Sequence, residues 1–379
     1  MFKYGLLKNK CMVVKVGLIG CGMASQREIL PRFPFEKDKL ELVAVCDTIE
    51  ERAKAVAEMY NVKKYYVDYH DMLDDPEIDA ILNVTPIRLH YQINREILEA
   101  GKHLYTQKPL ALTVKECDEL INLMRKKNLK VVASPGQMLN PLLQRLKKVI
   151  KSGVLGKLCV GVFASGGVQH EIASRGGVDP TWYYKKPGGG PLYDFTVYTL
   201  HTMTGLLGPA KRVSAFSGIA LPKREWMGKE INVEVDDNTV MLLDFGNASY
   251  CMVNGTNAVR WAFTDDYHSF MMFFTKGAIL GTDLGRVKAK IYIEQNILGF
   301  ESGWFEPASP WRDEPVPMKG GADWIWADIL HLVDCIENDK KPIASAEHAR
   351  HVIDIIESAY ISAQKGSPVE LRTSFEEVI

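Results

Sequence analysis

The fold is decided near the N-terminus by the stretch Val13-Val14-Lys15-Val16-Gly17-Leu18-Ile19-Gly20-Cys21-Gly22-Met23-Ala24-Ser25. Its apolar, β-branched first half predicts a buried strand, and the glycines follow where a helix begins. Gly20 permits a tight turn, and Gly22 lets the backbone approach a pyrophosphate held by amides at the helix N-terminus. This strand, turn and helix are typical of dinucleotide-binding folds.

The remainder of the turn is a weaker signal. Met23 and Ala24 would add their backbone amides to the phosphate site. Ser25 stands where glycine or alanine is usual, although a small side chain still permits close packing of the helix. Alone, this hexapeptide does not establish a nucleotide site.

An acidic residue strengthens the case. Asp47 follows the predicted strand 41–46, where a carboxylate can accept hydrogen bonds from both ribose hydroxyls. The same charge would repel a 2′-phosphate, so NAD is favoured over NADP, and Arg52 one turn on softens that preference. Asp47 could instead be the N-cap of a helix beginning at Glu50, and the two roles can coexist.

Two domains are expected from 379 residues. Residues 12–135 alternate short strands with amphipathic helices, which predicts a doubly wound parallel sheet of the Rossmann type. Residues 136–379 change to period-two stretches, which predict an α+β domain with an open, mostly antiparallel sheet. Helices near 323–337 and 347–364 finish the chain, and we allow for their packing back on the first domain.

Composition narrows the function. The 46 basic and 47 acidic side chains leave a formal charge of −1, which argues against nucleic-acid or membrane surfaces. Seven scattered cysteines indicate reduced thiols and a cytoplasmic protein. We expect no metal ion, and we interpret the residues before Met12 as an extension, so that Met1 and Met12 both remain possible starts.

Polar residues follow two later strands, at the edge where ligands bind such sheets. They are Thr85-Pro86 with His90, and Gln107-Lys108-Pro109. Together with Glu99-Ala100-Gly101-Lys102-His103, these runs resemble the Gfo/Idh/MocA oxidoreductases, whose pattern reads T-P-N-x-x-H, E-A-G-K-H and E-K-P-L-A-x-T. The resemblance extends from about Met12 to the final helix.

The resemblance implies hydride transfer between a nicotinamide and a carbon of a sugar, inositol or related polyol. Thr85, His90 and Gln107 then belong to the cofactor site, and Lys108 touches the reacting hydroxyl. A lysine beside an oxidised nicotinamide experiences a like charge and desolvation, which lower its pKa. Gln107 replaces the family glutamate, and the loss of that carboxylate should lower the Lys108 pKa further. The family's lysine–proline bond is often cis.

A glycine-rich break at Pro187-Gly188-Gly189-Gly190-Pro191 predicts the start of a helix. That helix carries Asp194, Tyr198 and His201 on one face. The family motif has an aspartate at 194 and usually a histidine at 198, whereas tyrosine at 198 resembles the glucose-fructose oxidoreductase and dihydrodiol dehydrogenase branches. Tyr198 is then the proton donor or acceptor, and its phenol needs a nearby cation to ionise at neutral pH.

Other site residues remain open. Asp194 would orient the substrate hydroxyl or the lysine. Trp182 and Tyr183 could stack on a sugar ring or pack at the domain junction. His201 is either a substrate contact or a packing histidine. Gln137 and Asn140 are further candidates for the pocket, and we assign no role to His170 and Arg175.

The sequence therefore predicts an NAD-dependent sugar or polyol dehydrogenase, with NADP possible. A second possibility is redox-neutral chemistry on tightly held NAD, as in sugar–sugar oxidoreductases or NAD-dependent glycosidases. A third is a non-catalytic NAD sensor, against which the retention of Lys108, Asp194 and Tyr198 argues. We expect a homo-oligomer, a dimer or tetramer, assembled through the C-terminal sheet.

Overall fold

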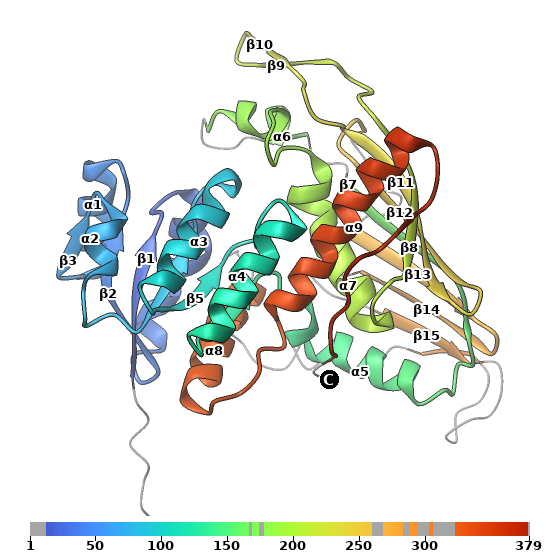
Figure 1. Cartoon of the computed structure of the whole chain (residues 1–379), viewed down its shortest axis with the longest axis horizontal. Helices are drawn as coiled ribbons and strands as arrows, with labels where there is room; N and C mark the ends of the chain where they lie inside the picture. Colours follow the sequence, from blue (N-terminus) through green and yellow to red (C-terminus); the bar gives the residue numbers. More distant parts are fainter. Residues whose placement is uncertain are drawn as a thin grey trace, which may run out of the picture.

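The computed structural model describes residues 13–166, 169–173, 178–259, 268–282, 289–293, 303–305 and 323–377. Met1, Met12 and Arg175 lie outside these residues. Two sheets stand apart, and helices fill the space between them (Figure 1).

The first sheet is parallel and six-stranded, in the order β3-β2-β1-β4-β5-β6. Its outermost strand β3, which the sequence pattern did not reveal, pairs with β2 over three residues. The doubly wound fold expected from the sequence is therefore present. The strands are β1 (Val14–Ile19), β2 (Leu40–Cys46), β3 (Lys64–Tyr66), β4 (Ala80–Asn83), β5 (His103–Thr106) and β6 (Val131–Ala133).

Helices connect these strands and cover the sheet. The first two are α1 (Glu50–Tyr60) and α2 (Tyr69–Leu73), and α3 (His90–Glu99) and α4 (Val114–Lys126) follow. α4 begins with a reciprocal capping box, because Thr113 accepts from the Glu116 amide and Glu116 accepts from the Thr113 amide.

The second sheet has nine strands in the order β16-β15-β14-β13-β7-β12-β11-β8-β17. Among the described strands of this second sheet, only β7 and β12 pair in parallel, so the sheet is mostly antiparallel, as expected. A separate hairpin, β9 (Lys223–Trp226) and β10 (Lys229–Asn232), projects at the top of Figure 1. The strands of the sheet are β7 (Leu158–Gly166), β8 (Arg212–Gly218), β11 (Asn238–Gly246), β12 (Ser249–Thr256), β13 (His268–Phe274), β14 (Gly277–Thr282), β15 (Ala289–Ile293), β16 (Gly303–Phe305) and β17 (Val369–Glu370).

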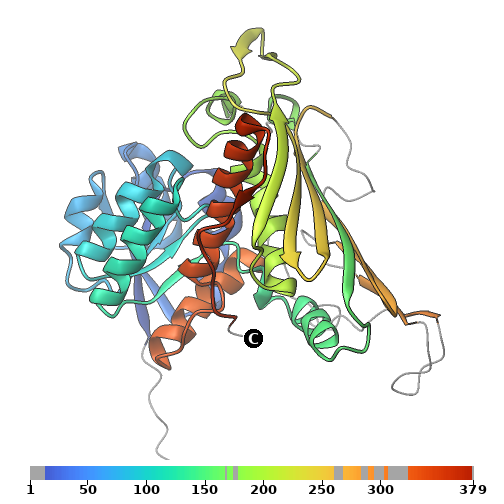
Figure 2. The same cartoon turned by 45° about the vertical axis from the view of Figure 1, so that its right-hand side comes forward.

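One face of this sheet is covered by helices. α7 (Val197–Leu207) is buried along almost its whole length, and it contacts both β7 and α5 (Pro141–Lys151). α9 (Ala346–Lys365) runs between the two sheets, packed on β8 and on α4 (Figure 2). A continuous apolar core therefore extends from the first sheet through α4 and α9 to the second.

α8 (Asp323–Glu337) packs against the first sheet instead, at β5 and β6. Its Trp326 meets Phe33 edge to face, with ring centroids 5.2 Å apart. The side chains of Ile325 and Ile329 enter the same cluster as β1. The core of the first sheet is therefore completed by residues near the end of the chain.

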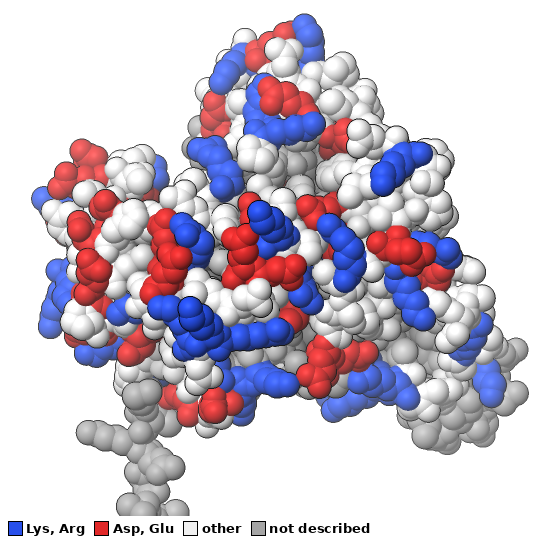
Figure 3. Space-filling view, in the orientation of Figure 1, with Lys and Arg blue, Asp and Glu red and all other residues white. Residues whose placement is uncertain are grey.

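The surface carries charges of both signs. Lys and Arg side chains alternate with Asp and Glu over the face shown in Figure 3, without a large area of one sign. Among the residues that the structure describes, no helix combines the length and the apolar character needed to span a membrane.

Candidate functional site

The glycine turn forms the first part of the site. Gly20 has a φ of +96°, and its amide donates to the Cys46 carbonyl at 2.8 Å. A Cβ on Gly20 would lie 2.6 Å from the Val84 carbonyl oxygen, so the turn requires glycine here. A Cβ on Gly22 would meet nothing within 4 Å, which leaves space for a ligand beside that backbone.

The helix after the turn begins irregularly. Residues Met23 and Ala24 open it, and Ser25–Ile29 form a π-helical turn. The Ser25 hydroxyl donates to the Gly20 carbonyl, which ties the helix to the turn. Ser25 therefore stabilises the turn through its hydroxyl group, which a glycine at this position could not do.

Asp47 holds this turn from the neighbouring strand. Its carboxylate accepts from the amides of Cys21 and Ile49, both at 3.0 Å, and pairs with Arg52 at 3.2 Å. The N-cap of α1 is Ile49, so the capping role considered for Asp47 is wrong. A carboxylate has about four acceptor positions, and the two amides with the two contacts of Arg52 occupy them, so ribose hydroxyls would have to bind in place of Arg52.

His90 and Thr85 lie at the end of β4. Both ring nitrogens of the buried His90 are bonded, to the carbonyl oxygens of Pro109 and Thr85, at 2.7 and 2.8 Å. Burial lowers the pKa of His90. Since the ring has no nitrogen left for a cofactor, His90 positions the two loops that follow β4 and β5. The Thr85 hydroxyl and amide both donate to Asn83.

Lys108 reaches across to the second part of the chain. It lies beyond β5, and its peptide bond to Pro109 is cis, as the resemblance implied. Its ammonium group binds the Asp194 carboxylate and also donates to the Asp194 carbonyl oxygen at 2.6 Å. Asp194 lies on a π-helical turn (Leu192–Thr196) directly before α7. π turns are frequent at functional sites because they alter the register of the helix.

The Asp194 side chain is only 11% exposed and has two cationic or donor neighbours. Burial alone would raise its pKa, but the Lys108 ammonium and His170 hold it well below the ordinary value. Asp194 is therefore a carboxylate that compensates the charge of Lys108.

Tyr198 lies beside this pair, with the Lys108 nitrogen 5.1 Å from the centroid of its ring. The pKa of Tyr198 is raised well above 10 by burial and by the charge of Asp194. Burial and the charge of Asp194 therefore outweigh any lowering of the Tyr198 pKa by Lys108. The protonated phenol is therefore the favoured form.

His170 is brought to the same carboxylate, although the sequence assigned it no role. Its Nε2 lies 2.9 Å from Asp194 Oδ2, and its ring centroid lies 4.0 Å from that of Tyr183. The contact joins residues 24 positions apart in the sequence. No spacing rule in the sequence could have revealed it.

The two aromatic candidates for sugar stacking, Trp182 and Tyr183, differ in solvent exposure. Trp182 is 40% exposed, whereas Tyr183 is completely buried and packs edge to face on Trp182. Tyr183 is therefore part of the packing beneath the site, and only Trp182 offers a free surface.

His201 lies inside the second half of the molecule. Its Nδ1–H donates to the Val197 carbonyl oxygen at 2.8 Å, and its ring packs on His348 of α9. Burial lowers its pKa to about 4. The packing alternative therefore describes His201, and the substrate contact does not.

Two tentative pocket residues also have structural roles. The buried Gln137 donates to Thr202 at 3.1 Å, and Asn140 caps α5 by accepting from the Leu142 amide at 2.8 Å.

Gln107 belongs to a polar cluster under the site. Its amide nitrogen donates to the Tyr105 hydroxyl at 2.8 Å. Asp328 of α8 is buried nearby and accepts from the Gly136 amide at 3.2 Å. Burial raises the pKa of Asp328 to about 7, and the Gly136 amide and the Ser134 hydroxyl offset part of that shift.

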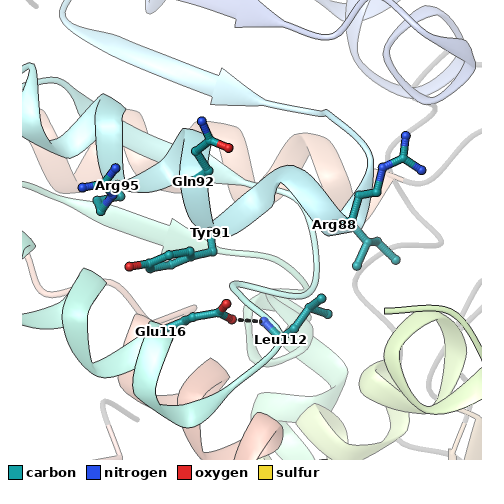
Figure 4. A pocket seen from close by; sticks show the side chains of 7 residues that line it. Arg88, Tyr91, Gln92, Arg95, Leu112 and Glu116 are labelled. Carbon is teal, nitrogen blue, oxygen red and sulfur yellow. Dashed lines mark hydrogen bonds between the residues drawn. The ribbon is translucent and has the colours of Figure 1, made fainter. Parts of the chain in front are cut away.

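A pocket lies beside the end of β4, between the start of α3 and the start of α4 (Figure 4). Glu116 lies within it and accepts from the Leu112 amide at 3.0 Å, so this carboxylate serves the helix cap. The pocket is lined by Ile87, Arg88, Tyr91, Gln92, Arg95, Leu112 and Glu116.

The described residues contain no group of three histidine, cysteine, aspartate or glutamate side chains that could hold a metal ion. They fit a dinucleotide well, since Gly22 leaves a cradle at the start of a helix beside the Asp47 carboxylate. A parallel six-stranded sheet with this turn defines the class of NAD-binding Rossmann oxidoreductases.

Comparison with known families gives the particular assignment. Residues 14–134 match the oxidoreductase family with an NAD-binding Rossmann fold, and residues 143–281 match the GFO/IDH/MocA C-terminal domain. The chain belongs to the Gfo/Idh/MocA family of NAD(P)-dependent oxidoreductases.

Its relatives are distant. Levoglucosan dehydrogenase of Pseudarthrobacter phenanthrenivorans is 23% identical, with 81% of this chain and 84% of that protein covered. Myo-inositol 2-dehydrogenase of Thermotoga maritima is also 23% identical, with 76% and 80% covered. A solved levoglucosan dehydrogenase with NADH and levoglucosan shares the fold, with a TM-score of 0.80 at 21% identity over 96% of this chain and all of that one.

Proposed function

We propose that the protein is an NAD-dependent sugar or polyol dehydrogenase. It transfers hydride between nicotinamide C4 and a secondary alcohol or ketone carbon of a sugar, glycoside or polyol. The observation that carries this proposal is the contact of Lys108 with Asp194 beside Tyr198, where two segments far apart in the sequence converge. Tyrosine at position 198 favours the branch that includes glucose-fructose oxidoreductase and dihydrodiol dehydrogenase.

In this proposal the bound nicotinamide supplies the hydride acceptor or donor. Lys108 binds the reacting oxygen of the substrate and is held by Asp194. Tyr198 exchanges the hydroxyl proton. Its raised pKa keeps the phenol protonated, so Tyr198 holds the proton that a carbonyl oxygen takes up during reduction, and the alcohol returns that proton in the reverse direction.

The cofactor site uses the turn described above. The backbones of Gly20, Gly22, Met23 and Ala24 face the pyrophosphate, and Asp47 accepts from the ribose hydroxyls. Arg52 is paired with Asp47, so its charge is compensated and NAD stays preferred over NADP.

Thr85 and Gln107, at the ends of β4 and β5, face the nicotinamide half of the cofactor. His90 supports both loops.

On the substrate side, Trp182 offers its exposed surface to the sugar ring, whose axial C–H groups stack on aromatic side chains. Several relatives are dehydrogenases of levoglucosan, inositol or xylose, which supports a carbohydrate as the substrate class.

Assembly into a dimer or tetramer is part of the same proposal. The face of the large sheet that bears no helices exposes apolar residues on adjacent strands. Val240 faces Phe216 and Val160 faces Phe273 in the strand register, so these side chains form one surface. Contiguous apolar surfaces of this kind mark protein interfaces, and a second copy presents the same surface.

The decisive experiment is a panel of sugars, inositols and glycosides tested with NAD and with NADP, followed by the absorbance of the reduced nicotinamide. We expect Lys108→Ala to lower kcat/KM by roughly 10²- to 10⁴-fold on any substrate that the wild type turns over. Lys115→Ala, an exposed lysine at the start of α4, is the control and should retain activity. Equal turnover by wild type and Lys108→Ala would remove Lys108 from the chemistry.

A further inference from the structure

The Asp194 carboxylate is held from two sides by residues of different segments. One oxygen, Oδ1, binds the Lys108 ammonium, and the other, Oδ2, lies 2.9 Å from His170 Nε2. His170 begins the short helix α6 (His170–Ala173). A carboxylate with partners on both oxygens cannot rotate without losing one of them.

The His170 ring is itself confined. Its centroid lies 4.0 Å from the Tyr183 ring and 5.6 Å from the Phe195 ring. Its side chain is 24% exposed, whereas those of Lys108 and Asp194 are 12% and 11% exposed. The imidazole therefore stands at the outer border of the pair and is oriented by aromatic packing.

The next residue anchors α6 on the opposite side. Glu171 pairs with Arg224 of β9 at 3.0 Å and accepts from the Tyr184 hydroxyl. Arg224 also pairs with Asp237 at 2.7 Å, and all three charged side chains are almost completely buried. Buried pairs with satisfied partners are costly to break, so this cluster fixes the position of His170.

We propose that His170 is a positioning residue, which orients the Asp194 carboxylate so that it holds Lys108 against the reacting oxygen of the substrate. The inference rests on the proposed dehydrogenase function. Its physical basis is that catalysis depends on near-attack geometry, where a small misplacement of a reacting group is costly. His170 acts through Asp194, and the main effect of its loss falls on kcat.

The test compares His170→Ala with His170→Gln on a substrate that the wild type turns over. We expect His170→Ala to lower kcat by roughly 10- to 100-fold while KM changes by less than about threefold. The Gln amide can donate to Asp194, so His170→Gln should recover most of the loss. His70→Ala, on the exposed surface of α2, is the control. A loss confined to KM, or equal losses in the Ala and Gln variants, would overturn the proposal.

A second measurement separates this inference from the proposed function. The free energies of unfolding of His170→Ala, Asp194→Asn and the double variant form a cycle that needs no turnover. We expect the double variant to lose clearly less stability than the sum of the single variants. Additive losses would overturn the role of His170, whereas absence of turnover by the wild type on every carbohydrate would overturn the proposed function alone.

Discussion

Asp47 combines two tasks that a single substitution can separate. Its carboxylate fixes the glycine turn through the Cys21 amide, and in the proposed function its charge discriminates between NAD and NADP. Asparagine keeps an acceptor oxygen for the turn but removes the charge.

Asp47→Asn should therefore weaken NAD binding more than NADP binding, changing the ratio of the two dissociation constants by roughly 10- to 100-fold. Fluorescence titration with NADH and NADPH measures both constants. Asp38→Asn, at the opposite end of β2, is the matched control and should leave the ratio unchanged. An unaltered ratio in Asp47→Asn would exclude this carboxylate from the ribose site.

Asp328 is a completely buried carboxyl group of α8, and burial favours its protonated form. Its folded-state pKa of about 7 lies above the ordinary value near 4, so the native state retains a proton that the unfolded chain loses. Stability consequently falls as the pH rises from about 4 through 7.

Asp328→Asn should remove this dependence. Relative to wild type, the variant should gain on the order of 4 kcal/mol in unfolding free energy between pH 4 and pH 8. Denaturant unfolding across a pH series measures the difference, with Asp71→Asn on exposed α2 as the control. Parallel curves for wild type and Asp328→Asn would show that the group is ionised in the folded protein.

At the level of elements, the turn between β1 and its helix depends on two glycines for different reasons. Gly20 needs its positive φ and has a carbonyl against its missing Cβ, whereas the space beside Gly22 is open. The fold requires Gly20, and in the proposed function the phosphates of the cofactor require Gly22.

Gly20→Ala should therefore lower stability by roughly 1–3 kcal/mol and also weaken cofactor binding. Gly22→Ala should keep the stability of the wild type and lose NADH affinity by at least about tenfold. Thermal unfolding and NADH titration of the two variants distinguish these effects. Wild-type affinity in Gly22→Ala would place the phosphates elsewhere.

Several elements could be predicted from the sequence with accurate bounds. Apolar spacing gave the helices at 50–60 and 323–337, which are α1 and α8. The edge strand β3 was not predicted, because its three residues are partly exposed and show no alternation of apolar and polar side chains. The capping box at Thr113 and Glu116 was a readable signal for α4 that the expected elements did not include.

The site could be predicted in part. Lys108, Asp194 and Tyr198 were identified from motifs, and the structure brings all three together. The sequence leaves His201 open between a substrate contact and packing, and its ring packs on His348, whereas the π turn at Leu192–Thr196 was not expected. Periodicity cannot reveal such a turn. His170 could not be found either, since its position depends on Arg224 in a distant hairpin.

For the whole molecule, the exposed sheet face predicts the quaternary structure. Leu242 on β11 is 55% exposed on that face, and it pairs with Met252 on β12. Burial of a carboxylate at a close-packed interface is unfavourable. Leu242→Glu should therefore lower the molar mass measured by light scattering to that of a smaller assembly.

Met59→Glu provides the control, because Met59 is exposed on α1 at the far side of the molecule. It should leave the molar mass unchanged. A wild type that elutes as a monomer at all concentrations would contradict assembly through this face.

The packing of α8 on the first sheet has a consequence for synthesis. Trp326 and Ile329 complete the core around Phe33, yet they are translated after every described strand of the second sheet except β17. Ribosomes add about 5–20 residues per second, and N-terminal domains usually fold while translation continues. In this protein we expect the apolar surface that α8 covers on the nucleotide-binding domain to stay exposed until α8 has been translated. A nascent chain that stalls before α8 would expose that surface, and chaperones should engage it there.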